Sequence, residues 1–117
     1  MIEPDGLDHE LVGTTTVIRF EGDLDAGNAD ELTARAVALS RDSRAVVLDL
    51  SATTYLDSAG VRLIDTVGRT CGPRGVPFAA FLPPDSVIRR VVELTLPTLE
   101  LIDDIDTWSA WSEGEGA

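Results

Sequence analysis

The amino-acid sequence predicts an α/β fold, a single domain with a mixed sheet of largely parallel inner strands and with helices packed on it. Three observations support this prediction. Apolar or β-branched segments alternate along the chain with segments of helical periodicity, which is the order that builds parallel sheets. The 117 residues suffice for one hydrophobic core, and no internal repeat or interdomain linker divides them. The shares of hydrophobic residues (44%) and charged residues (26%) are ordinary for a globular protein.

The first strand is predicted over residues 11–22, which are rich in β-branched residues and alternate in polarity from Thr16 to Phe20. Residues 7–12 precede it and can form the first arm of a hairpin that turns at Gly13.

A helix is predicted over residues 25–41, because apolar residues recur there at helical spacing: Ala29, Leu32, Ala36 and Leu39. Asp25 or Asn28 can supply its N-cap, and Arg41 near its end suits the helix dipole.

A central strand is predicted at residues 45–50, a continuous apolar run broken only by Asp49 and therefore buried on both faces of the sheet. Asp49 is expected either as a hydrogen-bonded structural residue or as an exposed residue at the strand end. The loop of residues 53–60 follows at the carboxyl edge of the sheet, where α/β folds meet ligands and partners. It leads into a second helix that ends at Gly72 and Pro73, with one apolar stripe of Gly60, Ile64, Val67 and Cys71.

In the last third of the chain, the sequence predicts a strand over residues 76–82 and a helix over residues 85–94. A short strand over residues 99–103 and a helical turn over residues 104–111 are predicted to follow. Asp85, after two prolines, is the expected cap of the helix. The helical turn is expected to pack Trp108 and Trp111 against the sheet edge in preference to forming a partner-binding patch. We place the domain at residues 1–112 and a disordered tail at residues 113–117.

Charge and composition exclude several function classes. The net charge is −12 and all nine basic residues are Arg, which argues against binding to a nucleic-acid backbone. The absence of Lys excludes Schiff-base chemistry, one Cys excludes a Cys-rich metal site, and one His leaves almost no room for a His-based metal site. No apolar run approaches the roughly 20 residues of a membrane helix, and the N-terminus lacks a signal pattern. A cytoplasmic protein without membrane insertion is expected.

Asp57 and Ser58 stand together where the central strand passes into the second helix, and three interpretations compete for them: a helix cap, a nucleophile and a site for a modifying enzyme. Both residue types are favoured helix N-caps. A serine nucleophile has little support, because Leu56 replaces the first Gly of a hydrolase elbow and the only candidate base is the distant His9. A separate alternative, a response-regulator phospho-aspartate site at a residue such as Asp49, would need a partner Lys that the chain lacks.

Residues 46–64, "VVLDLSATTYLDSAGVRLI", resemble the central signature of STAS domains, specifically those of bacterial anti-sigma factor antagonists. Upstream, "FEGDLDAGNADEL" resembles the family's Gly-Glu/Asp-Leu-Asp segment that enters the first helix. Downstream, "RGVPFAAF" and "PPDSVIRRVVEL" take the places of the next strand and helix. The resemblance covers residues 14–105. It departs from the family at residues 95–97, Thr-Leu-Pro, where a Gly-Leu turn is usual.

The resemblance implies a single STAS-like domain with a regulatory role and no catalytic activity or cofactor of its own. Family members bind an anti-sigma factor that is also a serine kinase, and thereby free a sigma factor to direct transcription. The kinase phosphorylates the serine that matches Ser58, which ends the complex, and a serine phosphatase restores it. The implied partner surface is Asp25, Asp57, Ser58, Ala59 and Gly60. The resemblance leaves the oligomeric state unassigned.

A second function fits the same resemblance: a STAS accessory subunit of a transport system, such as a lipid ABC transporter, without a phosphorylation switch. In that case Ser58 would be structural or would contact the ATPase.

Other residues are given structural interpretations. Thr53 and Thr54 are expected as hydrogen-bonding residues in preference to secondary phosphoacceptors, and Cys71 as a small buried residue. The acidic group of Asp103, Asp104 and Asp106 lacks the Gly and closing Glu of a calcium loop and is expected to be solvated.

Overall fold

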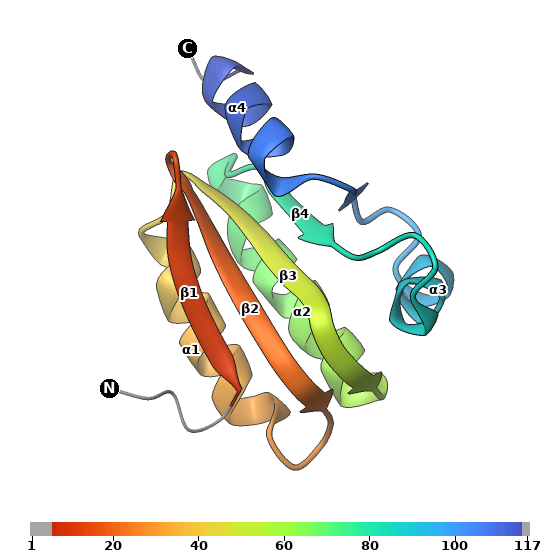
Figure 1. Cartoon of the computed structure of the whole chain (residues 1–117). Helices are drawn as coiled ribbons and strands as arrows, with labels where there is room; N and C mark the ends of the chain where they lie inside the picture. The colour runs from red at the N-terminus through yellow and green to blue at the C-terminus, as the bar shows by residue number, and fades with distance from the viewer. Residues whose placement is uncertain (1–5, 116–117) are drawn as a thin grey trace.

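The computed structural model describes residues 6–115. Its five strands form one mixed sheet in the order β1-β2-β3-β4-β5 (Figure 1). β1 (Leu7–Val12) and β2 (Thr15–Leu24) form an antiparallel hairpin. β3 (Ala45–Leu56), β4 (Phe78–Phe81) and β5 (Leu101–Ile102) each add parallel to the strand before them. The predicted α/β class, with a mixed sheet and parallel inner strands, is confirmed.

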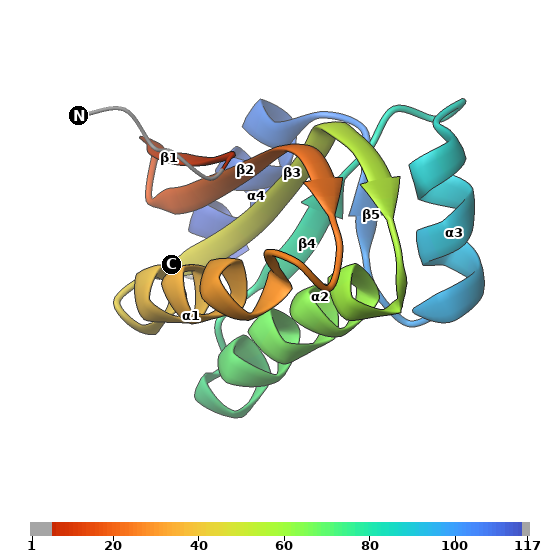
Figure 2. The same ribbon diagram turned by 90° about the horizontal axis from the view of Figure 1, so that it is seen from below.

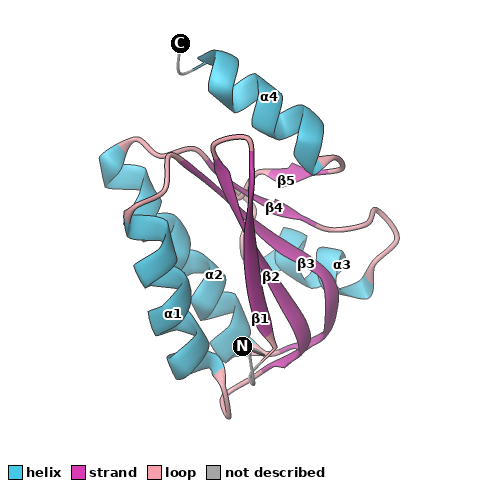
Figure 3. Ribbon diagram, turned by 60° about the vertical axis from the view of Figure 1, so that its left-hand side comes forward, coloured by secondary structure: helices cyan, strands magenta, loops and turns pink. Residues whose placement is uncertain are grey.

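Helices provide the connections that parallel strands require. α1 (Ala29–Arg41) and α2 (Ser58–Cys71) lie side by side on one face of the sheet, and α2 runs on into a short 3₁₀ turn (Gly72–Arg74). α3 (Val87–Thr95) lies beyond β5 at the sheet edge, and α4 (Ile105–Glu115) lies on the face opposite α1 and α2 (Figures 2 and 3). Among the described residues, no helix is both long and apolar enough to cross a bilayer.

The two faces of the sheet carry separate hydrophobic clusters, because successive residues of a strand point to opposite faces. Ile18 and Leu48 belong to the larger cluster, under α1 and α2, whereas Val17 and Val47 belong to the smaller one, under α4. This two-sided burial explains the continuous apolar run at the start of β3, as predicted from the sequence.

The hairpin between β1 and β2 turns through Gly13 and Thr14, since Val12 pairs with Thr15. Gly13 has a φ of 62°, as expected at the first loop position of a type II′ turn, which matches the twist of the flanking strands. The predicted turn at Gly13 is therefore confirmed. It divides the strand predicted for residues 11–22, because β1 ends at Val12 and β2 begins at Thr15.

Several element boundaries differ from the sequence predictions, and three of these differences are the most consequential. β3 continues to Leu56 and α2 begins at Ser58, so the first half of the predicted loop of residues 53–60 is strand and its last three residues are helix. α3 is capped by Ser86 and not by Asp85, because the Ser86 hydroxyl accepts hydrogen bonds from the N–H groups of Ile88 and Arg89 at 3.1 and 3.3 Å.

The third boundary is at the C-terminus, where α4 is a helix of 11 residues and not a single turn. It continues through Glu115 into the predicted tail of residues 113–117, and residues 116–117 lie outside the described residues. The domain limit at residue 112 therefore stays a prediction.

Candidate functional site at the start of helix α2

The carboxyl ends of β2 and β3 lie side by side at one edge of the sheet. Leu24 pairs with Leu56, and the N–H of Asp57 donates to the carbonyl oxygen of Leu24 at 3.3 Å. Asp25 and Asp57 therefore begin two neighbouring connections, one into α1 and the other into α2 (Figure 2). We call residues 24–29 the α1 entrance and residues 56–60 the α2 entrance.

Asp57 caps α2. Its backbone is extended, and its carboxylate Oδ1 accepts hydrogen bonds from the N–H groups of Ala59 at 2.8 Å and Gly60 at 3.2 Å. These N–H groups are among those that a helix leaves without a partner in its first turn. The capping interpretation is thus correct for Asp57, the first member of the pair.

Ser58 is the first residue of α2 and is exposed to solvent. Its hydroxyl makes no hydrogen bond to the residues that the structure describes, because Asp57 already satisfies the nearby N–H groups. The hydroxyl is therefore accessible to a modifying enzyme and is not needed to hold the start of the helix.

Gly60, which the sequence places in the partner surface, is buried. A Cβ at this position would lie 2.8 Å from the carbonyl oxygen of Leu24 and would also clash with Cδ1 of Leu56. Gly60 therefore allows α2 to approach the end of β2 closely, and it supports the surface from beneath. The prediction that it faces a partner is corrected on this ground.

The α1 entrance is organised differently. Asn28 occupies the N-cap position of α1, but its side chain makes no capping hydrogen bond. Its amide oxygen accepts from the N–H of Asp25 at 3.1 Å, and its amide nitrogen donates to the carbonyl oxygen of Asp23 at 2.8 Å. Asp25 Oδ1 accepts from the N–H of Gly27 at 2.9 Å. Both predicted caps therefore hold the loop, and neither side chain caps the helix.

The strand leading to the α2 entrance presents further side chains. Thr53 is buried and donates to the carbonyl oxygen of Phe20 at 3.1 Å, and Thr54 donates to Asp23 Oδ1 at 3.1 Å, as their predicted hydrogen-bonding roles require. Tyr55 is 51% exposed on β3. No role was predicted for this side chain from the sequence, because residues 53–60 were predicted to form a loop. Its β-branched neighbours were the available signal for a strand.

The surface around Ser58 is mainly anionic. Asp23, Asp25 and Asp57 follow or end the two strands, and Arg62 is the exposed cation one helical turn beyond Ser58. Residues four apart lie on the same side of a helix, so Arg62 is the nearest positive side chain along α2.

The alternative catalytic interpretation finds no support in the arrangement of the sheet. His9 lies on β1 opposite Ile18, in a shallow hollow with Arg19, and Ile18 in turn pairs with Leu48 of β3. Ser58 follows β3 ten positions after Leu48 in the chain, beyond the far end of that strand. His9 and Ser58 are therefore not brought together.

The remaining candidates have structural partners. Asp49 is 2% exposed and accepts from Arg19 Nε at 3.1 Å and from the Ser51 hydroxyl at 2.6 Å, so its predicted structural role is confirmed. The hydrogen bond to Asp49 and its charge raise the pKa of Arg19. Cys71 is buried as predicted, and burial raises the pKa of its thiol.

The C-terminal predictions are confirmed only in part. Trp108 is buried against the sheet, but Trp111 is 55% exposed, so its predicted packing is wrong. Asp103, Asp104 and Asp106 are exposed, and no cluster of potential metal ligands occurs in residues 6–115.

Comparison with known proteins gives a family match and a curated relative. The STAS domain family profile matches residues 7–107. The chain is 29% identical over 69 residues to Osmosensory protein A of Mycobacterium tuberculosis, and this match covers 59% of the chain and 44% of that protein. The chain thus spans less than half of the length of this curated relative.

Two solved structures share the fold. An anti-sigma factor antagonist from Mycobacterium paratuberculosis superposes with a TM-score of 0.78 at 24% identity, over 97% of this chain and 99% of that one. The phosphorylated form of the Bacillus cell fate determinant SpoIIAA has a TM-score of 0.68 at 19% identity, over 89% of this chain and 96% of that one. At these identities the similarity establishes the fold.

Proposed function

Because the chain belongs to the STAS domain family, we propose that it is an anti-sigma factor antagonist that phosphorylation of Ser58 switches off. The unmodified protein binds an anti-sigma factor that is also a serine kinase, and a sigma factor is released. The kinase transfers the γ-phosphoryl group of ATP to Ser58 Oγ, the hydroxyl proton leaves, and ADP is the leaving group. A serine phosphatase hydrolyses the phosphoester and restores the binding form.

The observation that carries this proposal is that Asp57 and Ser58 have different roles at the start of α2. Asp57 supplies the cap of α2, which leaves the Ser58 hydroxyl exposed and outside the hydrogen bonding of the fold. A kinase can therefore reach it without opening the domain. The relatives whose structures superpose on this chain include an anti-sigma factor antagonist and a phosphorylated regulator, which supports the same role.

The partner surface that we propose consists of Asp25, Asp57, Ser58 and Ala59, extended by the exposed ring of Tyr55. Aromatic side chains provide large contact areas at low entropic cost and are enriched at protein interfaces. The carboxylates of this surface favour a partner with a basic face.

A phosphate on Ser58 adds about −1.5 to −2 charges and three acceptor oxygens at the N-terminus of α2. The helix dipole tolerates a negative charge there, at a gain of about 0.3–1 kcal/mol, and Arg62 offers a counter-charge one turn away. The fold should therefore withstand the modification.

The interface has no such compensation. A partner that accepted a neutral hydroxyl beside Asp57 must now desolvate a dianion in a surface that is already acidic. Weakening a complex from about 10 nM to about 10 μM requires ~4 kcal/mol, which one buried uncompensated charge can supply. The switch then acts through the surface of the protein.

In this proposal the protein catalyses no reaction itself. It acts in the cytoplasm, where ATP and the sigma factor are present. The experiment is to incubate it with candidate anti-sigma factor serine kinases and ATP, and to map the phosphate by mass spectrometry. Wild type and Thr54→Val should be labelled, and Ser58→Ala should not. Thr54 is the matched control, an exposed hydroxyl four residues upstream of Ser58.

Equal labelling of Ser58→Ala and wild type would show that another residue is the acceptor. Binding of the kinase with no labelling of either protein would show an unregulated antagonist. A failure of all candidate kinases to bind, with capture by a transporter ATPase instead, would favour the transport accessory.

A further inference from the structure

A hollow of about 430 Å³ lies between β5 and the start of α4, far from the α2 entrance. Ile102 and Trp108 are buried at its base, and the exposed ring of Trp111 contributes to its wall. We call it the tryptophan hollow, because it holds both Trp residues of the chain. α4 lies at the opposite end of the sheet from the carboxyl ends of β2 and β3 (Figure 1).

Three carboxylates line the hollow: Glu100, Asp103 and Asp104. Trp108 Nε1 donates to Glu100 Oε2 at 3.2 Å, which fixes this carboxylate beside the indole. Hydrogen bonds from the side chain and backbone of Thr107 lower the pKa of Asp104. Asp104 is therefore anionic at neutral pH.

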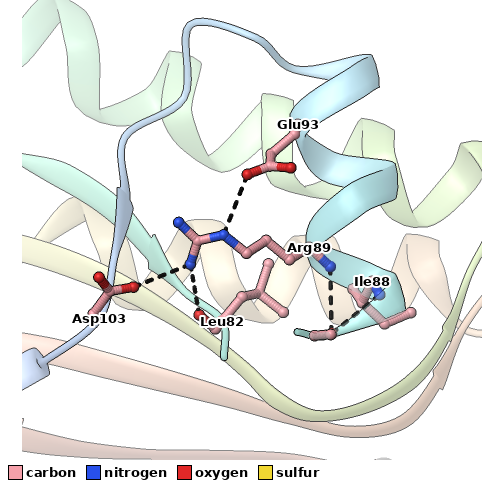
Figure 4. Close-up of polar contacts among 6 residues, drawn as sticks. Leu82, Ile88, Arg89, Glu93 and Asp103 are labelled. Atoms are coloured by element: carbon pink, nitrogen blue, oxygen red, sulfur yellow. Dashed lines mark hydrogen bonds and ion pairs between the residues drawn. The ribbon is translucent and has the colours of Figure 1, made fainter. Parts of the chain in front are cut away.

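The chain already pairs one guanidinium with this rim. Arg89 of α3 donates from Nη1 to Asp103 Oδ1 at 3.2 Å and to the carbonyl oxygen of Leu82 at 2.8 Å (Figure 4). Arg89 Nε also donates to Glu93. Within the described chain, no cation pairs with Glu100 or Asp104, so two of the three carboxylates on the rim have hydrogen bonds but no ion-pair partner.

We propose that the tryptophan hollow binds an arginine side chain of a protein partner, carried on a basic segment with apolar neighbours. The guanidinium stacks on the Trp111 ring and donates to Glu100 and Asp104, and an apolar neighbour covers Ile102 and Trp108.

Charge complementarity and ring chemistry both select this occupant. A cation is attracted to the face of an aromatic ring, and the indole of Trp is the best aromatic partner. A guanidinium also carries several N–H groups, which can donate hydrogen bonds to the carboxylate oxygens. A quaternary ammonium has no such donor. The open wall and the apolar base favour a side chain presented by a larger partner.

This proposal is independent of the Ser58 switch, because its residues lie on β5, α4 and the segments before them. The test uses the full chain and a dye-labelled amphipathic peptide of arginine, leucine and alanine, with fluorescence anisotropy as the readout. The comparison peptide replaces each arginine by citrulline, which keeps the shape and removes the charge.

We expect binding of the arginine peptide and at least tenfold weaker binding of the citrulline peptide. Trp111→Ala and Glu100→Gln should each weaken the arginine peptide at least fivefold. Glu100→Gln keeps an acceptor for Trp108 Nε1 while removing the charge. Asp30→Asn removes one exposed charge from α1, on the other face of the sheet, and should leave the affinity within twofold.

Equal loss in Asp30→Asn and Glu100→Gln would overturn the proposal, because it would show general attraction to an acidic protein. Unchanged affinity in Trp111→Ala, or equal binding of the two peptides, would also overturn it. Thermal melting of each variant confirms folding, and Trp111→Phe, which keeps an aromatic platform, should recover part of the affinity lost in Trp111→Ala.

Discussion

The two helix entrances at the carboxyl edge of the sheet have the same position in the fold and opposite organisation. At the α2 entrance, one side chain, Asp57, caps the helix, and the next residue, Ser58, is left exposed. At the α1 entrance, Asn28 and Asp25 bond to their own loop, and α1 has no side-chain cap.

This difference separates the polar side chains that stabilise the fold from the one that a modifying enzyme can reach. The α1 entrance uses its polar groups to fix a loop, so modification there would break structural hydrogen bonds. The α2 entrance concentrates the structural work in Asp57 and in the close packing of Gly60, and thereby keeps a hydroxyl that folding does not use. A surface switch requires a group of that kind.

The largest expected difference between the entrances is in partner binding. Ser58→Glu should weaken the complex with the anti-sigma factor by about 4 kcal/mol, or roughly a thousandfold, because a fixed negative charge must be desolvated beside Asp57. Ala26→Glu adds the same charge at an exposed position of the α1 entrance, and its loss should be at least tenfold smaller. Isothermal titration calorimetry measures both. Equal losses would mean that net charge, and not position, controls binding.

The next difference is in packing. Gly60→Ala should lower the free energy of unfolding by about 2 kcal/mol and the Tm by roughly 10 °C, because its Cβ would meet the backbone of Leu24. Gly27→Ala should change stability by less than about 0.5 kcal/mol, since its Cβ would approach only a side-chain oxygen of Asp25. Calorimetric melting compares the two, and equal Tm values would show that the α2 entrance is not tightly packed.

A smaller difference is expected for capping. Asp57→Ala should lower the free energy of unfolding by about 1 kcal/mol, and Asp57→Ser should restore most of it, since serine is also a good cap. Asp25→Ala removes one exposed hydrogen bond to Gly27 and should cost only about 0.3 kcal/mol. Urea denaturation resolves these values, and a larger loss for Asp25→Ala than for Asp57→Ala would reverse the assigned roles.

Local patterns were sufficient to predict most elements. The apolar run at the start of β3, the stripe of α2 and the glycine of the hairpin each depend on near neighbours in the chain. The cap of α2 was predictable for the same reason, because Asp57 bonds to N–H groups two and three residues ahead.

Features that depend on distant residues were missed. β3 extends to Leu56 only because β2 extends beside it, with Glu21 opposite Ala52 and Leu24 opposite Leu56. Gly60 looked like part of an exposed motif, and its burial depends on contact with β2. Trp111 was expected to pack like Trp108, but the sheet offers α4 one buried side, which Trp108 occupies.

The account can be tested most directly on one sample of protein phosphorylated on Ser58, compared with the unmodified protein. Its Tm and its affinity for the anti-sigma factor are measured under the same conditions. We predict Tm values within about 3 °C of each other and an affinity roughly a thousandfold lower after phosphorylation. Unchanged affinity, or a lost affinity accompanied by a Tm decrease of about 10 °C or more, would contradict a switch that acts through the surface.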